Sequence, residues 1–133
     1  MLSATRKAIP ILLLAIVSGS AMADWVEVGR SKTDTLYVDP STIRGTDKVA
    51  RMWALNDYKA TQRLDNREPF KSETMEYEYD CKDEQSRLLY FTSHPDNMAE
   101  GEVLDFNVVP GAWTRNPPGS GLEVLWKIAC GKV

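Results

Sequence analysis

Hydrophobic and polar residues alternate along most of the chain between residues 25 and 109, as they do in half-buried β-strands. Polar turns and segments containing proline or glycine interrupt the alternation and divide it into separate strands. The pattern predicts six strands, which cover residues 25–30, 35–39, 48–59, 72–81, 87–93 and 102–109. Both faces of the 48–59 segment carry apolar residues, so we expect this strand to be central in the sheet.

The turn that follows the second predicted strand begins with Asp39 and Pro40. Because proline has no backbone N–H and cannot continue a ladder of hydrogen bonds, we expect the strand to end at Asp39. Ile43, a little further on, is then expected to plug the rim of the core. The polar segment 60–70 ends in Glu68-Pro69 and is predicted to be a loop.

One helix is predicted, at the C-terminal end of the sequence. Ser120 is a suitable N-cap, and Glu123 three residues later completes a capping box. Apolar residues then recur with helical spacing, at Leu122, Leu125, Trp126 and Ala129. Gly131 stands where a C-terminal glycine cap belongs. The expected fold class is therefore α+β, an antiparallel sheet of about six strands with one C-terminal helix packed against it.

Residues 1–23 have the regions of a secretory signal peptide. Arg6 and Lys7 form the basic start, residues 8–17 form the apolar run, and Ala21-Met22-Ala23 fits the A-x-A cleavage pattern, with the cut before Asp24. The apolar run has 10 residues, and a membrane-spanning helix needs about 20. An uncleaved anchor is the alternative. No cysteine adjoins the cut to carry a lipid anchor, so we expect a single exported domain, residues 24–133, without a membrane span, in the periplasm or outside the cell.

Composition narrows the possible functions. Loss of residues 1–23 removes two positive charges and changes the net charge from −3 to −5, whereas nucleic-acid binders are usually basic. Two cysteines and one histidine are too few for a zinc site of four such ligands. His94 is predicted to lie in a loop, and no nucleophile elbow, HExxH, P-loop or GxGxxG motif is present. We therefore expect no catalysis and no cofactor.

Both cysteines lie in the predicted exported domain. In an oxidising compartment the default is a disulfide between Cys81 and Cys130, which would tie the end of a strand to the last turn of the helix. A redox-active thiol is the alternative, although the sequence has no C-x-x-C motif.

Two charged groups are candidate binding surfaces. Basic residues recur every fourth position at Lys59, Arg63, Arg67 and Lys71. They could form a patch for an anionic ligand or a matrix component, or a solvated loop. Acidic residues alternate along one strand at Glu76, Glu78 and Asp80. They could bind a cation such as calcium or steer a basic partner, or form an ordinary solvated strand face.

The four tryptophans, at positions 25, 53, 113 and 126, are spread along the chain. Core packing is the expected use, because each large aromatic side chain buries about 150–250 Å². An aromatic face that contacts a sugar or a haem is the alternative.

The order of several short motifs resembles a known family. The motifs are Trp25 to Gly29, Tyr37 to Ile43, Val49 to Tyr58 with Trp53-Ala-Leu-Asn-Asp-Tyr58, Tyr77 to Cys81, Arg87, Met98, Gly101, the Trp113 segment, Pro118 to Ser120 and Lys127 to Cys130. Together they resemble the surface-adhesin protein E family of bacterial envelope proteins over nearly all of the predicted domain. The resemblance implies the family's fold and its disulfide at the paired cysteines. It also implies binding of host extracellular-matrix and serum proteins, the activity of the adhesin for which the family is named.

Three functions follow from these observations. The first is a secreted or periplasmic binding module without catalysis, which binds a host protein or an envelope protein. The second is a periplasmic accessory protein in envelope maintenance. The third is a small hydrolase, which would need a cleft that holds His94 near carboxylates.

Overall fold

The computed structural model describes residues 23–108 and 110–133. The predicted signal peptide therefore lies outside the described residues, apart from Ala23. The elements, in chain order, are β1 (Val26–Arg30), β2 (Asp34–Gly45), β3 (Val49–Gln62), β4 (Phe70–Asp80), β5 (Gln85–His94), the 3-10 turn η1 (Asn97–Ala99), β6 (Asp105–Asn107), β7 (Thr114–Arg115) and the helix α2 (Gly121–Ala129). The prediction of an α+β fold is confirmed.

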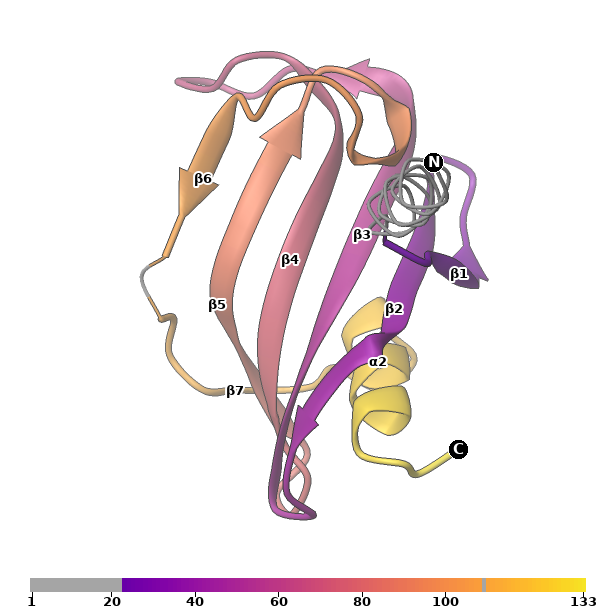
Figure 1. Ribbon diagram of the computed structural model, residues 1–133, viewed down its shortest axis with the longest axis vertical. Coiled ribbons are helices and arrows are strands. Elements are labelled where there is room, and N and C mark those ends of the chain that lie inside the picture. Colours follow the sequence, from indigo (N-terminus) through magenta and orange to yellow (C-terminus); the bar gives the residue numbers. More distant parts are fainter. Residues whose placement is uncertain (1–22, 109) are drawn as a thin grey trace, which may run out of the picture.

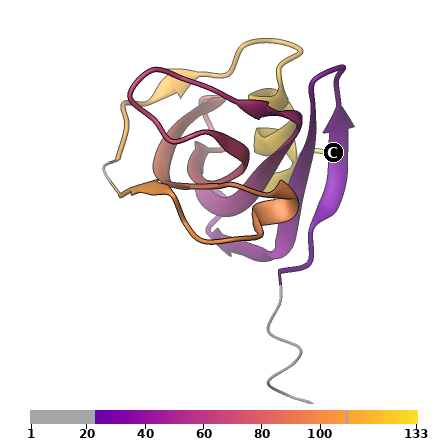
Figure 2. The same cartoon turned by 90° about the horizontal axis from the view of Figure 1, so that it is seen from above.

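The strands form one antiparallel sheet in the order β1-β2-β3-β4-β5-β6, and β7 pairs with β5 beyond the end of β6 (Figure 1). From β1 to β6, neighbours in the sheet are also neighbours in sequence, because each connection returns the chain beside the strand that it has just left; β7 instead returns to β5. β3 lies between β2 and β4, as its two apolar faces predict. Seen from above, the sheet is strongly curled (Figure 2).

The helix α2 packs on one face of this sheet and closes the main core. The buried members of the core are Val38, Ala50, Met52, Ala54, Met75, Tyr79, Cys81, Leu125, Trp126 and Ala129. The indole N–H of Trp126 donates to the carbonyl of Asp80 at 2.8 Å, and Cys130 forms a disulfide with Cys81. The helix is therefore fixed to the end of β4 by a hydrogen bond and a covalent link, and the predicted disulfide is confirmed.

The start of α2 follows the predicted capping pattern with one difference. Ser120 is the N-cap, and its hydroxyl accepts from the backbone N–H of Glu123 at 3.2 Å. The carboxylate of Glu123 reaches back to the N–H of Gly119 at 3.1 Å, one residue before the N-cap. Both interactions satisfy backbone donors near the first turn, which has no earlier carbonyls to use.

The prediction that β2 ends at Asp39 is wrong. The strand continues through Pro40 to Gly45, with a shift of register against β3 between Asp39 and Arg44. Within this irregular stretch the hydroxyl of Thr42 accepts from the backbone N–H of Trp53 at 3.0 Å. The Thr42 side-chain oxygen thus replaces a backbone acceptor where the ladder is interrupted, and the bulge accommodates Pro40, which has no backbone N–H.

The edge of the sheet beyond β4 also differs from the prediction. The expected strand 102–109 shortens to β6, while β7 is an additional strand that the alternation does not indicate. β6 pairs with residues 91–93 of β5 and β7 with residues 85–86. Between them the N–H of Gly111 donates to the carbonyl of Leu88 at 2.7 Å, so three short segments share one long strand.

Candidate functional site

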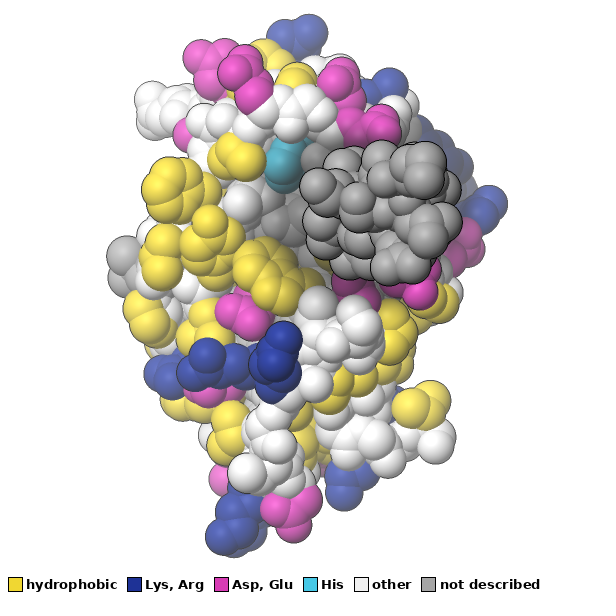
Figure 3. All heavy atoms as spheres, viewed as in Figure 1, with side chains coloured by type: hydrophobic (Ala, Val, Ile, Leu, Met, Phe, Trp, Pro, Cys, Tyr) yellow, Lys and Arg dark blue, Asp and Glu magenta, His cyan; other side chains and the backbone are white. Residues whose placement is uncertain are grey.

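The sheet face opposite α2 carries a row of aromatic rings. Trp53, Glu76 and Tyr90 are opposite one another on β3, β4 and β5. The rings of Trp53 and Tyr90 meet edge to face across the strand that carries Glu76, with their centroids 5.2 Å apart. Phe106 on β6 continues the row, 6.2 Å from Tyr90, and is 64 % exposed. Figure 3 shows hydrophobic side chains gathered over β5 and β6.

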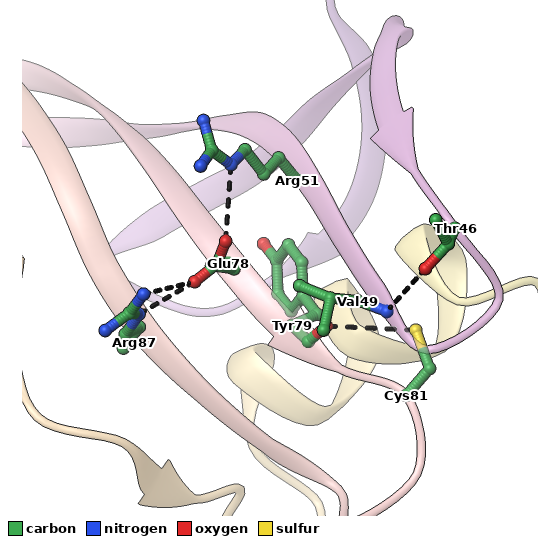
Figure 4. A network of polar contacts seen from close by, with 7 residues as sticks. All are labelled: Thr46, Val49, Arg51, Glu78, Tyr79, Cys81 and Arg87. Carbon is green, nitrogen blue, oxygen red and sulfur yellow. Dashed lines mark hydrogen bonds and ion pairs between the residues drawn. The ribbon is translucent and has the colours of Figure 1, made fainter.

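A row of charged residues lies beside the aromatic row. The cross-strand partners Arg51, Glu78 and Arg87 lie on β3, β4 and β5. Arg87 donates from two nitrogens to Glu78 at 2.6 and 2.8 Å, and Arg51 donates to its other oxygen at 3.3 Å (Figure 4). The Arg87 guanidinium also lies over the Trp113 ring, with its central carbon 4.7 Å from the ring centroid. We name these two rows, Trp53, Glu76, Tyr90, Phe106, Arg51, Glu78, Arg87 and Trp113, the aromatic face.

The charge balance of the aromatic face follows from this network. Glu78 is only 7 % exposed and holds two guanidinium groups, so it cannot neutralise both. Arg51 keeps 52 % of its side chain exposed. Paired guanidinium and carboxylate groups hold their side chains in fixed geometry, and Arg, Trp and Tyr are the residues most enriched among energetically important interface contacts. The aromatic face therefore presents a pre-arranged mixed surface suited to a protein partner.

The upper end of the same sheet face is covered by the connection between β5 and β6. Asp57 accepts from the side-chain N–H of Asn97 at 2.9 Å and from the backbone N–H of Met98 at 2.8 Å. The Ser72 hydroxyl donates to the Asp96 carbonyl at 2.6 Å and accepts from the N–H of Ala99 at 2.9 Å. These bonds fasten η1 over β3 and β4, and the aromatic face begins where this cover ends.

His94 does not lie in a loop, so that prediction is wrong. It ends β5 and is buried beneath the β5–β6 connection. Its Nε2 is 2.8 Å from the Thr92 hydroxyl, which hydrogen-bonds Thr74, and its Nδ1 is 3.4 Å from the Gly101 carbonyl. His94 thus ends a hydrogen-bonded chain through the hydroxyl groups of Thr92 and Thr74, and its other ring nitrogen faces a backbone carbonyl. The His94 side chain is therefore packed among polar groups of its own polypeptide chain.

The candidate acidic residues divide into three environments. Glu76 lies on the aromatic face and is half-buried, while Glu78 is held between the two arginines. Asp80 accepts from the backbone N–H groups of Lys82 and Asp83 and from Gln85. These bonds lower the pKa of Asp80 in spite of its partial desolvation, which is the larger single effect and acts to raise it. In the described residues no group of three or more metal-ligating side chains gathers at this stripe.

The candidate basic residues also separate. Lys59 and Arg63 are exposed, and Lys71 is half-buried. Arg67 is turned inward: its guanidinium lies over the rings of Phe70 and Phe91, and its nitrogens are 3.7 Å from Glu73 and 3.9 Å from Asp105. The structure thus gives Arg67 partners within the chain.

A groove lies on the other face of the sheet, beside the start of α2. Its larger part, about 480 Å³, lies between β1, β2 and the helix N-terminus, and an adjoining part of about 240 Å³ shares Asn56, Met75 and Tyr77 with it. Desolvation, with the nearby Glu73 charge, raises the pKa of the Tyr77 phenol. Asp34 and Glu73, two of its charged lining residues, already hydrogen-bond within the chain. The groove has the size of a small-ligand pocket, but these two carboxylates already have partners within the chain.

Sequence reasoning missed the aromatic face as a unit. Alternation places Trp53 and Tyr90 on strands, but only the register of β3, β4 and β5 sets them on either side of Glu76. Trp53 and Trp113 are both half-buried on this surface and not in the main core, in contrast to Trp126. The available signal was weak: an arginine and an aromatic residue on β3 and again on β5, with alternating glutamates on the strand between them.

The fold and this surface define a small antiparallel-sheet domain with an aromatic and charged face opposite its helix. The chain belongs to the surface-adhesin protein E family, whose model matches residues 25–131. The fold is also that of the crystal structure of protein E from non-typeable Haemophilus influenzae, with a TM-score of 0.53 and 12 % sequence identity over 83 % of this chain and 86 % of that chain. No curated protein shows significant similarity to the sequence. The resemblance to the family inferred from the ordered motifs is therefore confirmed.

Membership in this family places the chain among proteins described as surface adhesins. Within residues 23–108 and 110–133, no helix has the length and hydrophobicity needed to cross a bilayer.

Proposed function

We propose that this protein is an exported binding module without catalytic activity, and that it binds a protein partner through the aromatic face. The observation that carries the proposal is the contact network of that face, in which Glu78 holds Arg51 and Arg87 beside the rings of Trp53 and Tyr90. Fixed side chains lose little conformational entropy on binding, and this lowers the cost of forming an interface.

The partner is expected to present apolar groups together with charged groups of both signs. The register places Arg115 on the same face as Arg51 and Arg87, and the same rows carry three carboxylates, Glu76, Glu78 and Asp80. The whole chain has a net charge of −3. A partner surface with an apolar centre and charges of both signs around it would therefore complement this face, and the overall negative charge of the chain disfavours a strongly acidic partner.

Site-specific photo-crosslinking tests the proposal. A photo-reactive amino acid replaces Phe106, which is exposed on the aromatic face, or Leu64, which is exposed in the β3–β4 connection and serves as the matched control. We expect one major protein adduct from position 106 in the native bacterium or in host extracellular matrix, and its loss when Arg51→Ala is added. Equal adducts from both positions, or an adduct that survives Arg51→Ala, would refute binding through this face.

Cell fractionation and intact mass decide which partner class applies. We propose that the precursor loses residues 1–23 on export, so the mature protein should begin at Asp24 and lack two thiol hydrogens. Mature protein on the cell surface or in the medium would support a host partner. Mature protein confined to the periplasm would exclude host adhesion and support an accessory role in envelope maintenance.

A further inference from the structure

Asp39 holds a buried carboxylate at the start of the β2 irregularity. The residue is 5 % exposed. Its Oδ1 accepts from the backbone N–H of Ser41 at 3.1 Å and from the Ser41 hydroxyl at 2.6 Å. Its Oδ2 accepts from the backbone nitrogen of Asp24 at 3.3 Å. All three partners are donors, which is the arrangement that an ionised carboxylate requires.

This carboxylate has no cationic side chain as a partner in the part of the chain that the structure describes. The ion pairs found there join Arg30, Arg51, Arg67 and Arg87 to other carboxylates. An ionised group that is buried without an opposite charge is costly, and the cost falls when a cation comes within hydrogen-bond distance.

The Asp24 nitrogen becomes such a cation when the chain is cut before it. In that hydrolysis, water adds across the Ala23–Asp24 peptide bond. The oxygen goes to the Ala23 carbonyl carbon, which becomes a carboxylate, and both hydrogens go to the Asp24 nitrogen, which becomes an ammonium group. An α-ammonium group has an unperturbed pKa of about 7.7–8.0 and is charged at neutral pH.

We propose that Asp39 is the receptor for the α-ammonium group that signal-peptide removal creates at Asp24. The inference rests on the export step of the proposed function. Processing then converts a neutral N–H contact of 3.3 Å into a partly buried ion pair, and such charge-assisted contacts shorten to about 2.7–2.9 Å. The cut thereby supplies a counter-ion to Asp39, which has no cationic side chain as a partner among the described residues.

Strand pairing explains why Asp24 is the residue that fits. Val26 at the start of β1 pairs with Val38 on β2, so the residues before β1 run alongside those after Val38. This brings the nitrogen of Asp24 to the side chain of Asp39. Consecutive Cα atoms are about 3.8 Å apart, so a cut one residue earlier would move the ammonium group out of hydrogen-bond reach.

The test compares two purified forms of the domain released from a cleavable N-terminal fusion. One begins at Asp24 and the other at Ala23, so the second keeps the Asp24 N–H but displaces the charge. We expect the Asp24 form to unfold at a Tm higher by about 5 °C, the effect of one charge-assisted contact in a domain of this size.

Two variants assign the difference to the ion pair. Asp39→Asn keeps an acceptor for Ser41 and removes the charge, so the two forms should then unfold at the same temperature. Asp47→Asn removes an exposed carboxylate in the β2–β3 turn, and the 5 °C difference should persist. Equal Tm values in the wild-type background, or an undiminished difference in Asp39→Asn, would overturn the proposal.

A second measurement does not depend on the stability of the Asn variant. An amine-reactive label at pH 8 should modify the α-amino group of the Asp24 form several-fold more slowly than that of the Ala23 form. Equal rates would overturn the ion pair. Separately, native protein that begins at another residue would overturn both the cut site and this role of Asp39, while binding through the aromatic face would stand.

Discussion

Replacing Cys81 and Cys130 together by alanine removes the covalent link between the end of β4 and the last turn of α2. Alanine leaves neither a free thiol that could form mixed disulfides nor a buried hydroxyl without a partner. The helix then depends on its apolar contacts and on the hydrogen bond from Trp126 to Asp80. The variant therefore measures what the disulfide contributes to the free energy of unfolding.

The expected size of the loss follows from the loop that the disulfide closes. The two cysteines are 49 positions apart in the sequence. In the chain-entropy model, a cross-link over about 50 residues stabilises the folded state by about 4 kcal/mol at 25 °C. For a domain of about 110 residues, an unfolding entropy of about 2.1 cal/mol/K per residue converts this into a fall in Tm of about 15–20 °C.

Thermal unfolding followed by far-ultraviolet circular dichroism measures the loss, with urea unfolding at 25 °C as the isothermal comparison. Wild-type protein in excess reductant is the matched control and should unfold with the double variant. A fall in Tm of less than about 5 °C would show that the unfolded chain is already compact, and it would refute the entropic reasoning.

Three further predictions concern single groups. Glu78→Gln should lower the free energy of unfolding in urea by about 1–2 kcal/mol, because two half-exposed guanidinium groups lose their shared anion; an unchanged midpoint would contradict a structural role. Ser120→Ala should cost about 1 kcal/mol by the same measurement, and Ser120→Asp, which restores an N-cap, should recover most of it. Burial and the neighbouring Glu73 carboxylate raise the pKa of the Tyr58 phenol. The stability that the neutral Tyr58 phenol contributes is therefore complete below pH 10 and declines above it. Between pH 9 and 11, Tyr58→Phe should consequently lose less stability than the wild type. Parallel losses in the two proteins would contradict this.

Local sequence patterns correctly predicted the elements whose formation depends on short stretches of the sequence. Alternation located β1, β3, β4 and β5, and the spacing of Leu125, Trp126 and Ala129 identified the buried side of α2. The compartment argument paired Cys81 with Cys130. In each case a short stretch of residues carries the signal, and the tertiary structure agrees with it.

The errors arise where distant residues override a local preference. Pro40 interrupts the regular hydrogen bonding of β2, but the strand continues because the Thr42 hydroxyl accepts a hydrogen bond from the backbone N–H of Trp53 on β3. The sequence around His94 indicates a loop, but the residue ends β5 and is buried because the β5–β6 connection folds back over it. Nothing near Thr114 in sequence indicates that β5 will pair with it.

The candidate site was accessible from sequence only in fragments. The acidic alternation correctly marked Glu78 as facing away from the core side of β4, but the arginines that hold it lie 27 and 9 residues away. Charge alone could not indicate that Arg67 would lie over two aromatic rings. Register between strands, which sequence alternation does not specify, decides which side chains meet.

The divided pairing of β5 has a consequence for how this protein avoids aggregation. A long unpaired strand at the edge of a sheet can template pairing with another chain, and such edges lead to aggregation. Here β6, the Gly111 contact and β7 occupy the outer side of β5 in three separate pieces. At the opposite edge, β1 is short, shifts register near Gly29 and carries an ion pair between Glu27 and Arg30. Each boundary of the described sheet is thus broken up or charged, which disfavours the edge-to-edge pairing of two copies of this chain.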